Sequence, residues 1–415
     1  MWKILIEEFI GDLKTQKLRA SLTMLAMTWG TIAVVLLLAF GEGLKVAIVR
    51  GLVNAGDQIF MVYGGQTSRV FEGLPTGRRI RLTEEDLDLV LRSVPEFEMG
   101  SPSYGRWGVN LRVGDQNTNT YMEGVAPEFL ELRRMFPAAG GRFINQQDME
   151  QRRRVLFLGN RIADRLFPEG DPVGKSVMLD GLPFTVVGVM QKKFQDSSNN
   201  GPDENRAIIP AATFKTIYGY RYVGHLILRP RSVEEAEQAK AALYRVLGRK
   251  YKFDPDDIRA LSMWDFVEDA KMVKAIGLGI QIFLGLVGGF TLLVAGVGVA
   301  NIMYVVVRER TREIGIKLAV GARKPHIMSQ FIFEAMLLAL VGGSIGLAFS
   351  ALVVTGLNAI PSGDNDAMAY IANPVLSWPI ALICVTILVA IGLIAGVLPA
   401  RRAAELDPVE SLRYE

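Results

Sequence analysis

The sequence is poor in cysteine and histidine, with one cysteine and two histidines among its 415 residues. A lone cysteine, Cys384, cannot form an internal disulfide framework. The two histidines, His225 and His326, stand apart in the sequence, without the clustered ligands that a metal site needs. The net charge of +3 is also small, so a basic surface for nucleic acid is not expected. These scarcities exclude a disulfide scaffold, a histidine-based metal centre and a nucleic-acid-binding protein.

Charge is scarce at both ends of the chain, whereas the middle is rich in it. A bilayer core about 30 Å thick needs about 20 apolar residues in a helix. Uncharged runs cover 22–40, 275–307 and 368–400, and a fourth apolar stretch, 325–363, contains Glu334 as its one acidic or basic residue apart from His326. We therefore predict four membrane spans, at about 22–40, 275–307, 326–357 and 376–400. Cleavage of the first as a signal peptide is the alternative, but Ala39-Phe40-Gly41 matches a cleavage site poorly.

The loop charges predict how these spans are oriented. The 308–325 loop carries an excess of lysine and arginine, whereas the 358–377 loop has none. Because positive loops stay in the cytoplasm, we expect this loop and both termini to be cytoplasmic, in the inner (cytoplasmic) membrane of the cell. Residues 41–270 then form an external domain. Ahead of the first span, apolar residues between Trp2 and Leu13 recur at helical spacing, which predicts an amphipathic helix along the membrane surface.

The external block has the pattern of an α+β domain. It reads strand–helix–strand, then an insert at about 100–205, then strand–helix–strand, which fits a ferredoxin-like split βαβ layer with a mostly-β insert. Asp180-Gly181, between two strand-like runs, is a strong hairpin signal. The polar segment Gln191–Asn205 is typical of a mobile loop.

Gly170-Asp-Pro-Val-Gly-Lys-Ser176 superficially matches a phosphate-binding loop. That motif needs a glycine five positions before the Gly-Lys pair, and position 169 is Glu. It also needs a helix after the lysine, whereas a hairpin is expected here, so a turn is the better interpretation. No nucleophile elbow or dinucleotide fingerprint is found, and Asp254, Asp256 and Asp257 lack calcium-loop spacing. We therefore expect no enzymatic activity, no metal and no cofactor on this chain.

Three segments carry a family resemblance. They are Lys17-Leu-Arg-Ala-Ser-Leu-Thr-Met-Leu-Ala26, Arg308-Glu-Arg-Thr-Arg-Glu-Ile-Gly-Ile-Lys-Leu-Ala-Val-Gly-Ala322 and Gly396-Val-Leu-Pro-Ala-Arg-Arg, the last continuing to Glu415. Together they resemble the permease subunit of the MacB/FtsX-like, or type VII, ABC transporters. In that family 271–415 would be the FtsX-like domain, and the fold would be α-helical in the membrane with a large α+β external domain.

The resemblance implies a set of partners. Two permeases would pair, as a homodimer or a heterodimer, each bound to an ABC ATPase that holds ATP and Mg²⁺. Because the chain begins shortly before its first span, we expect that ATPase to be a separate polypeptide. An adaptor (membrane-fusion) protein would bind the external domain, and ATP-driven motion would drive efflux of a drug, peptide or toxin. Release of lipoproteins and activation of an external partner enzyme are the alternatives.

The resemblance also implies that a short coupling helix between the second and third spans docks on the ATPase. The residues expected there are Arg310, Arg312, Glu313, Ile314, Gly315, Ile316, Leu318 and Gly321. Ile314, Ile316 and Leu318 are unusually apolar for a free loop, which indicates a covered surface. The alternative is that these side chains pack on the permease's own spans.

Two further expectations concern the spans themselves. Glu334 lies about two turns inside the third span, where a partner on a neighbouring helix or a headgroup would stabilise it. We interpret it as structurally paired; a carboxylate on a transport path is the alternative. Glycines 285, 288, 289, 296 and 298 give the second span a flat side for close helix packing.

Overall fold

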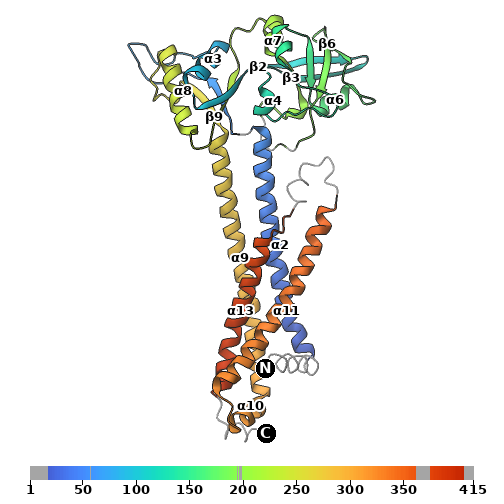
Figure 1. Cartoon of the computed structure of the whole chain (residues 1–415), viewed down its shortest axis with the longest axis vertical. Coiled ribbons are helices and arrows are strands. Elements are labelled where there is room, and N and C mark those ends of the chain that lie inside the picture. The colour runs from blue at the N-terminus through green and yellow to red at the C-terminus, as the bar shows by residue number, and fades with distance from the viewer. Residues whose placement is uncertain (1–16, 57, 194, 196–198, 361–373, 406–415) are drawn as a thin grey trace. The chain divides into compact units, whose positions relative to one another are not determined.

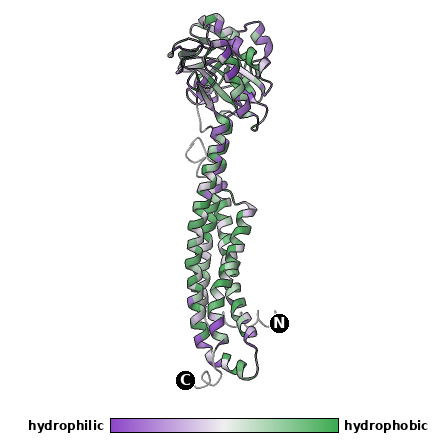
Figure 2. Ribbon diagram, turned by 90° about the vertical axis from the view of Figure 1, so that its left-hand side faces the viewer, coloured by the Kyte–Doolittle hydropathy of each residue, from purple (hydrophilic) through white to green (hydrophobic). Residues whose placement is uncertain are grey.

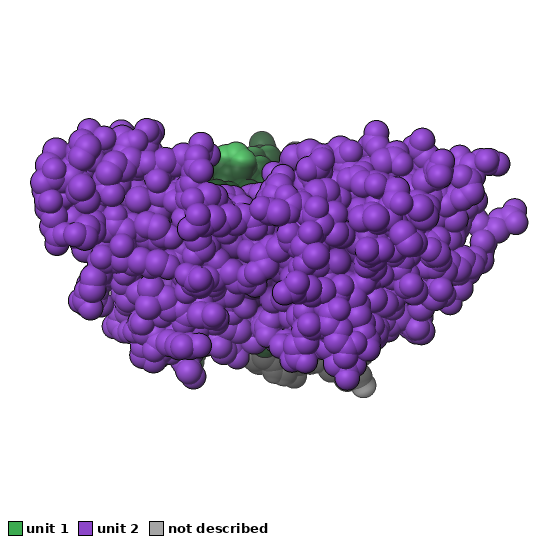
Figure 3. Space-filling model, turned by 90° about the horizontal axis from the view of Figure 1, so that it is seen from above, with its two compact units in different colours: residues 1–47, 275–415 green, residues 48–274 purple. Residues whose placement is uncertain are grey.

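The computed structural model describes every residue except 1–16, 57, 194, 196–198, 361–373 and 406–415. The predicted amphipathic helix before the first span and the last part of the C-terminal motif lie outside the described residues. The chain divides into two compact units (Figure 3). The helical unit consists of residues 1–47 and 275–415, and the sheet unit consists of residues 48–274.

Four long helices confirm the predicted spans. They are α2 (Lys17–Ala55), α9 (Phe266–Glu309), α11 (Lys324–Asn358) and α13 (Trp378–Ala404). Each is long and apolar enough to cross a membrane, and hydrophobic residues dominate them along much of their length (Figure 2). The 44 residues of α9 extend about 66 Å at 1.5 Å per residue. This exceeds a bilayer core of about 30 Å, so part of α9 lies outside the apolar layer.

The core of the helical unit is built from all four of these helices. Buried side chains include Met27 of α2, Val299 of α9, Phe331 of α11 and Leu388 of α13. Proline occupies the first turn of both α11 and α13, where its fixed φ favours helix initiation and its missing N–H costs nothing. A fifth helix, α10 (Thr311–Ala319), packs on the same core through Ile314.

The described residues of the sheet unit form a nine-stranded sheet, and Figure 1 shows its strands among the helices of this unit. Its strands are β1 (Phe60–Gly64), β2 (Phe97–Val113), β3 (Gln116–Val125), β4 (Val155–Leu158), β5 (Ser176–Leu179), β6 (Leu182–Val189), β7 (Arg206–Pro210), β8 (His225–Pro230) and β9 (Leu261–Asp265). Its helices are α3 (Glu84–Ser93), α4 (Phe129–Leu132), α5 (Gln146–Glu150), α6 (Asn160–Leu166), α7 (Ala211–Tyr218) and α8 (Ala236–Tyr251). The strand order is β3-β7-β4-β6-β5-β2-β8-β1-β9.

The ferredoxin-like part occupies one end of this sheet. There the order is β2-β8-β1-β9, every neighbour is antiparallel, and α3 and α8 connect β1 to β2 and β8 to β9. This is the split βαβ arrangement that the sequence predicted. Alternate residues of β1 face opposite sides of the sheet. Phe60 and Val62 join one hydrophobic core, and Met61 joins a second.

Strand β2 lies where the insert was predicted to begin, near residue 100, and it belongs to both parts of the sheet. It pairs with β8 along 97–103 and with β3 along 103–113, with a register shift between Arg106 and Val109. Gly108 at this bulge has φ +72°, a conformation that glycine adopts without steric cost. A bulge re-aims a strand without ending it, so both parts share one continuous sheet.

The predicted hairpin at Asp180-Gly181 is confirmed. Leu179 pairs with Leu182, and the two turn residues have φ of +44° and +83°, as a two-residue turn between antiparallel strands requires. Lys175 is therefore followed by strand β5 and not by a helix, so no helix N-terminus faces a phosphate here. Its ammonium lies 5.3 Å from the centre of the Phe167 ring.

Candidate functional site: the segment between the second and third spans

Helix α10 forms where the coupling helix was expected. It is bounded by Arg310 at its start and by Gly321 beyond its end. Gly321 has φ +102°, and its N–H donates to the carbonyl of Leu318 at 3.0 Å. A glycine in this conformation ends a helix and satisfies its last carbonyl groups. The segment is therefore a helix of defined length and not a continuation of α9.

One face of α10 packs on the helical unit. Ile314 is 3% exposed and belongs to its hydrophobic core, Gly315 is buried, and Leu318 packs against that core from its edge. This corrects the expectation that Ile314 faces a partner, because its side chain is already covered by the chain's own helices. Ile314 therefore packs on the chain's own span helices, which was the alternative derived from the sequence.

The opposite face of α10 is exposed. Arg312, Glu313 and Gly321 are exposed, and Ile316 is 48% exposed. Val320, at 85% exposed, was missed by the sequence analysis although it lies four residues after Ile316. Residues four apart share a helix face, so this spacing was an available signal. Ile316 and Val320 form an apolar pair on the exposed face, and docking by that face stays a prediction.

Two polar contacts attach α10 to α11. Arg310 Nη1 lies 3.7 Å from Glu334 Oε2, and both side chains are 13% exposed. Lys317 Nζ lies 3.3 Å from Gln330 Oε1. The structure thus pairs Glu334 with an arginine, as the structural interpretation of this acid requires. With Ile314 in the core, these contacts hold α10 to the bundle along its length.

Several glycines on α11 and α13 lie close to a neighbouring span helix. A β-carbon added at Gly342 would lie 2.9 Å from the Met24 carbonyl oxygen of α2, and one at Gly346 would lie 2.8 Å from the Thr28 carbonyl oxygen. On α13, a β-carbon at Gly396 would lie 2.9 Å from Ala335 Cβ of α11. Small residues four apart permit such close helix approach.

This finding limits the packing predicted for the second span. Of its five glycines, Gly288 abuts Val34 and Gly296 abuts Ile391, but a β-carbon at Gly285, Gly289 or Gly298 would meet no described atom within 4 Å. The flat side expected on α9 is therefore only partly used within this chain.

The sheet unit contains a buried set of charges that the sequence analysis missed. We define the ion cluster as Glu123, Arg133, Lys193, Asp203 and Arg206. Arg133 Nη2 and Lys193 Nζ each lie 2.8 Å from a different oxygen of Asp203. Arg206 Nη1 lies 2.6 Å from Glu123 Oε2. Every side chain of the ion cluster is at most 9% exposed. These charges are therefore stabilised by one another and not by water.

The ion cluster joins the end of a span helix to the sheet. Lys193 Nζ donates to the backbone carbonyl oxygens of Asn54 and Arg133, at 2.8 and 2.7 Å. Asn54 lies in the last turn of α2, where carbonyl groups lack helical partners and a cation is favourable. Arg206 Nη2 donates to the carbonyl oxygen of Gly201 at 2.8 Å. Within segment 191–205, Lys193, Gly201 and Asp203 are thus held by specific contacts, and the mobility predicted for the segment as a whole stays a prediction.

The ionisation of this region follows from its burial. Burial lowers the pKa of Lys193 to about 8, although Asp203 opposes the change. Burial would raise the pKa of Asp203, but Arg133, Lys193 and Arg206 outweigh it and hold that pKa below its usual value. Burial also lowers the pKa of His225 to about 4, although Glu123 Oε1 lies 3.9 Å from its Nε2. His225 is therefore neutral near neutral pH, while the Lys193–Asp203 pair is largely charged.

No local signal in the sequence could have assembled the ion cluster. Its members come from β3, the turn after α4, the segment after β6 and the start of β7. They are spread over more than 80 positions of the chain, and each resembles an ordinary surface charge. Only the pairing of β3 with β7 brings Glu123 beside Arg206.

These features define a class of protein: a chain with four helices long and apolar enough to cross a membrane, and a β-rich unit between the first two of them in the sequence. Comparison with known families makes the assignment specific. The MacB-like periplasmic core domain matches residues 20–246, and the FtsX-like permease C-terminal domain matches residues 285–408. The chain therefore belongs to the MacB/FtsX-like family of type VII ABC transporter permeases, which confirms the resemblance found in the sequence.

Curated relatives extend this comparison. The chain is 30% identical over 413 residues to "Macrolide export ATP-binding/permease protein MacB" of Wolinella succinogenes, covering 97% of this chain and 60% of that protein. It is 29% identical over 399 residues to "Pyoverdine export ATP-binding/permease protein PvdT" of Pseudomonas aeruginosa, covering 95% of this chain and 56% of that protein. The chain thus spans about three-fifths of the length of these relatives.

A solved structure was also found, the periplasmic region of MacB from Actinobacillus actinomycetemcomitans. It has a TM-score of 0.43 and 17% identity, covering 55% of this chain and 97% of that chain.

Proposed function

We propose that this chain transmits ATP-driven motion from an ABC ATPase, bound at α10, to its external domain, and so drives export. Membership of the permease family and the export proteins among the relatives support this proposal. The observation that carries it is the two-sided character of α10. One face is fixed in the bundle by Ile314, while Ile316 and Val320 remain exposed on the other.

The exposed face suits a protein partner. Ile316 and Val320 expose apolar surface beside Arg312, and interface centres favour apolar residues and arginine. A force applied to this face would reach α11 through Ile314, the Arg310–Glu334 pair and the Lys317–Gln330 contact. Packed side chains and ion pairs are the physical means by which such coupling passes through a protein.

The docking role can be tested with Ile316→Asp. The variant should reach the membrane normally but lose the ATPase that co-purifies with the unaltered chain, because a carboxylate would be buried without a partner. Ile258→Asp is the matched control, since Ile258 is a 77% exposed isoleucine of the sheet unit. Undiminished recovery of the ATPase with Ile316→Asp, repeated with Val320→Asp, would place the docking surface elsewhere. Ile314→Asp is unsuitable because it would disrupt the core.

The proposal assigns ATP hydrolysis to a partner ATPase subunit. Lys175, in the segment that resembles a phosphate-binding loop, precedes a strand and faces the Phe167 ring. We expect the purified chain to show no ATP turnover and Lys175→Ala to leave that result unchanged. Turnover that Lys175→Ala abolishes would contradict the assignment. ATP and Mg²⁺ would accordingly bind to the ATPase and not to this chain.

The orientation follows the loop charges, with both termini and α10 in the cytoplasm. Asp115→Cys and Arg323→Cys, each in a Cys384→Ala background, report on the two sides. Cys384 is 1% exposed, so it would react only slowly with the thiol reagent, and the Cys384→Ala background removes even this slow labelling. A membrane-impermeant thiol reagent should label the Asp115 position and spare the Arg323 position in intact cells or spheroplasts. The reverse pattern would invert the proposed topology.

The partners beyond the ATPase follow from the export proposal. We expect a second permease, identical or related, and an adaptor protein on the external domain. Affinity purification from native membranes, followed by identification of the bound subunits, tests both expectations. Recovery of an adaptor together with an ATPase supports export. Recovery of a lipoprotein carrier or a cell-wall hydrolase instead would favour lipoprotein release or signalling, respectively.

A further inference from the structure

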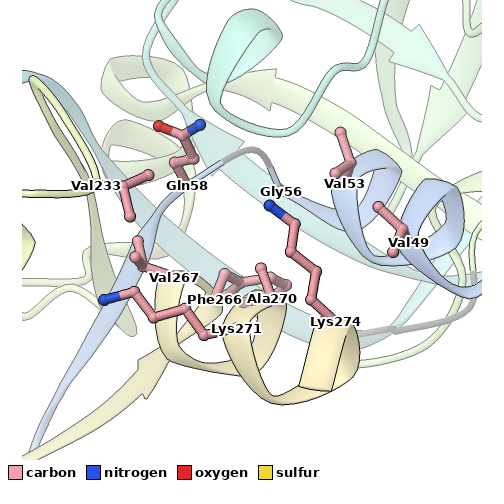
Figure 4. A pocket seen from close by; sticks show the side chains of 10 residues that line it. All are labelled: Val49, Val53, Gly56, Gln58, Val233, Phe266, Val267, Ala270, Lys271 and Lys274. Carbon is pink, nitrogen blue, oxygen red and sulfur yellow. The ribbon is translucent and has the colours of Figure 1, made fainter. Parts of the chain in front are cut away.

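A pocket of about 130 Å³ lies within the sheet unit, between the last turns of α2 and the first turns of α9 (Figure 4). Val49 and Val53 line it from α2, and Phe266, Val267 and Ala270 line it from α9. The pocket walls are therefore mainly hydrocarbon. An apolar cavity of about 150 Å³ is known to bind benzene, so this pocket has room for one ring or a chain of similar size.

Two lysines of α9 also line the pocket, and Gly56, Gln58 and Val233 complete the lining. Lys271 and Lys274 are three residues apart, which places them on one face of the helix, and in Figure 4 the Lys274 side chain extends across the pocket. Both are exposed. No described residue forms an ion pair or hydrogen bond with either ammonium group. Two positive charges therefore lie at the edge of an apolar pocket without a described counter-ion.

Three acidic residues near the start of α9 have partners other than these lysines, and one of them is Glu268, whose Oε2 lies 3.8 Å from Lys240 Nζ. Asp265 Oδ2 lies 3.2 Å from Lys240 Nζ, and Asp269 Oδ2 accepts a hydrogen bond from Trp264 Nε1 at 2.7 Å. The C-terminal end of α2 would repel an anion through its exposed carbonyl groups, but Lys193 Nζ already donates to one of them, at Asn54. Lys271 and Lys274 would therefore present the positive charge that a ligand meets at this edge of the pocket.

We propose that this pocket binds a small amphiphilic anion from the external aqueous side, an aromatic carboxylate in the simplest case. The ring would replace water against Val53, Phe266 and Ala270, and the carboxylate would contact the ammonium groups of Lys271 and Lys274. Apolar pockets with a few convergent polar groups are the usual form of small-molecule sites. The proposal does not depend on export, because binding can be measured without ATP or an ATPase.

Fluorine NMR of the full chain in phosphatidylcholine nanodiscs can measure this binding. The probes are para-trifluoromethylbenzoate and its neutral counterpart, para-trifluoromethylbenzamide, which share the apolar ring and differ in charge. Empty nanodiscs give the background from partition into lipid. We expect the benzoate to bind about fivefold more tightly than the benzamide, which corresponds to two partly exposed charge contacts.

Three variants locate the site. Lys271→Gln combined with Lys274→Gln should remove the preference for benzoate and leave benzamide binding unchanged. Ala270→Leu, which keeps a good helix former while filling the pocket, should weaken both probes. Lys252→Gln is the matched control, because Lys252 is an exposed lysine of the same unit outside the pocket, and it should change neither.

Equal affinity for the two probes, or a benzoate preference that survives loss of both lysines, would overturn the proposal. So would full binding by Ala270→Leu, provided that its thermal unfolding matches the unaltered chain. A final measurement replaces part of the lipid with phosphatidylglycerol. Displacement of the benzoate by this anionic lipid would assign the pocket to a lipid headgroup and contradict a ligand from the aqueous side.

Discussion

The two units of this chain both have hydrophobic cores, but they differ in what else their interiors contain. The sheet unit buries five charged side chains in the ion cluster, whereas the helical unit brings backbones together at glycines such as Gly342, Gly346 and Gly396. Between span helices surrounded by lipid, apolar association gains little, so close packing at small residues must hold them together. A domain outside the bilayer has hydrophobic cores to stabilise it, and can therefore retain a charged network that fixes specific segments. The difference predicts which substitutions each unit tolerates.

The largest expected effect is in the ion cluster. Asp203→Asn would leave Arg133, Lys193 and Arg206 without their shared counter-ion. Breaking a buried charge network in this way costs about 3–5 kcal/mol. The free energy of unfolding of the sheet unit, followed by chemical denaturation, should fall by that amount. Glu98→Gln, which breaks the pair of an exposed acid with Arg229, is the control and should have little effect. A small loss with Asp203→Asn would mean that water already screens the cluster.

His225 makes the sheet unit sensitive to acid. Burial lowers its pKa to about 4, from an ordinary value of 6.5, so the unfolded chain binds a proton that the folded chain rejects. Stability should therefore fall as pH drops from about 6.5 towards 4, by about 3 kcal/mol at most. Thermal unfolding at about pH 7 and about pH 5 measures the change. His225→Gln should reduce this dependence, and an equally steep pH profile in the variant would assign it to other groups.

The glycine contacts of the helical unit should respond more moderately. Gly396→Leu forces α13 away from Ala335 of α11, and overpacking of this kind costs about 1–3 kcal/mol. The matched control is Gly285→Leu, since a β-carbon there meets no described atom within 4 Å. Thermal unfolding in nanodiscs should separate the two variants. If Gly285→Leu destabilised the protein as strongly, the exposed side of α9 would be packed against a partner.

The most local expected effect is at the C-terminal end of α2. Lys193→Met keeps the length of the side chain but removes the donor to the Asn54 carbonyl, together with the donor to the Arg133 carbonyl and the ion pair with Asp203. Loss of a charged hydrogen bond is worth about 1.5–3 kcal/mol, which should raise hydrogen exchange in the last turn of α2 by about tenfold or more. Lys252→Met is the control on an exposed lysine. Unchanged exchange near Asn54 would show that Lys193 does not hold this helix end.

Much of the fold could be predicted because its signals are local. A long run without charge, such as 275–307, directly predicts a span helix. Asp180-Gly181 predicts a hairpin because these residues tolerate the positive φ angles that a two-residue turn requires. The long strand β2 was missed because Gly100, Pro102, Gly105 and Gly108 interrupt any simple alternation. Its pairing with two different partners is decided by the sheet and not by its own composition.

In the candidate site, too, the sequence predicted the character of the segment but not the role of each residue. The sequence marked 308–325 as apolar and basic, but it could not tell Ile314 from Ile316. The two lie two residues apart, so a helix turns them to different sides, and only packing on the bundle decided which is buried.

The sequence by itself determined the four apolar helices, the α+β character of the external domain and the family. Hydropathy and turn chemistry are properties of neighbouring residues, so they can be read from the sequence without knowledge of the fold. Tertiary structure alone decided which glycines touch, where Ile314 points and how Glu123 meets Arg206 across β3 and β7. Those contacts join residues far apart in the chain, and their energies depend on burial, which no single segment of sequence specifies.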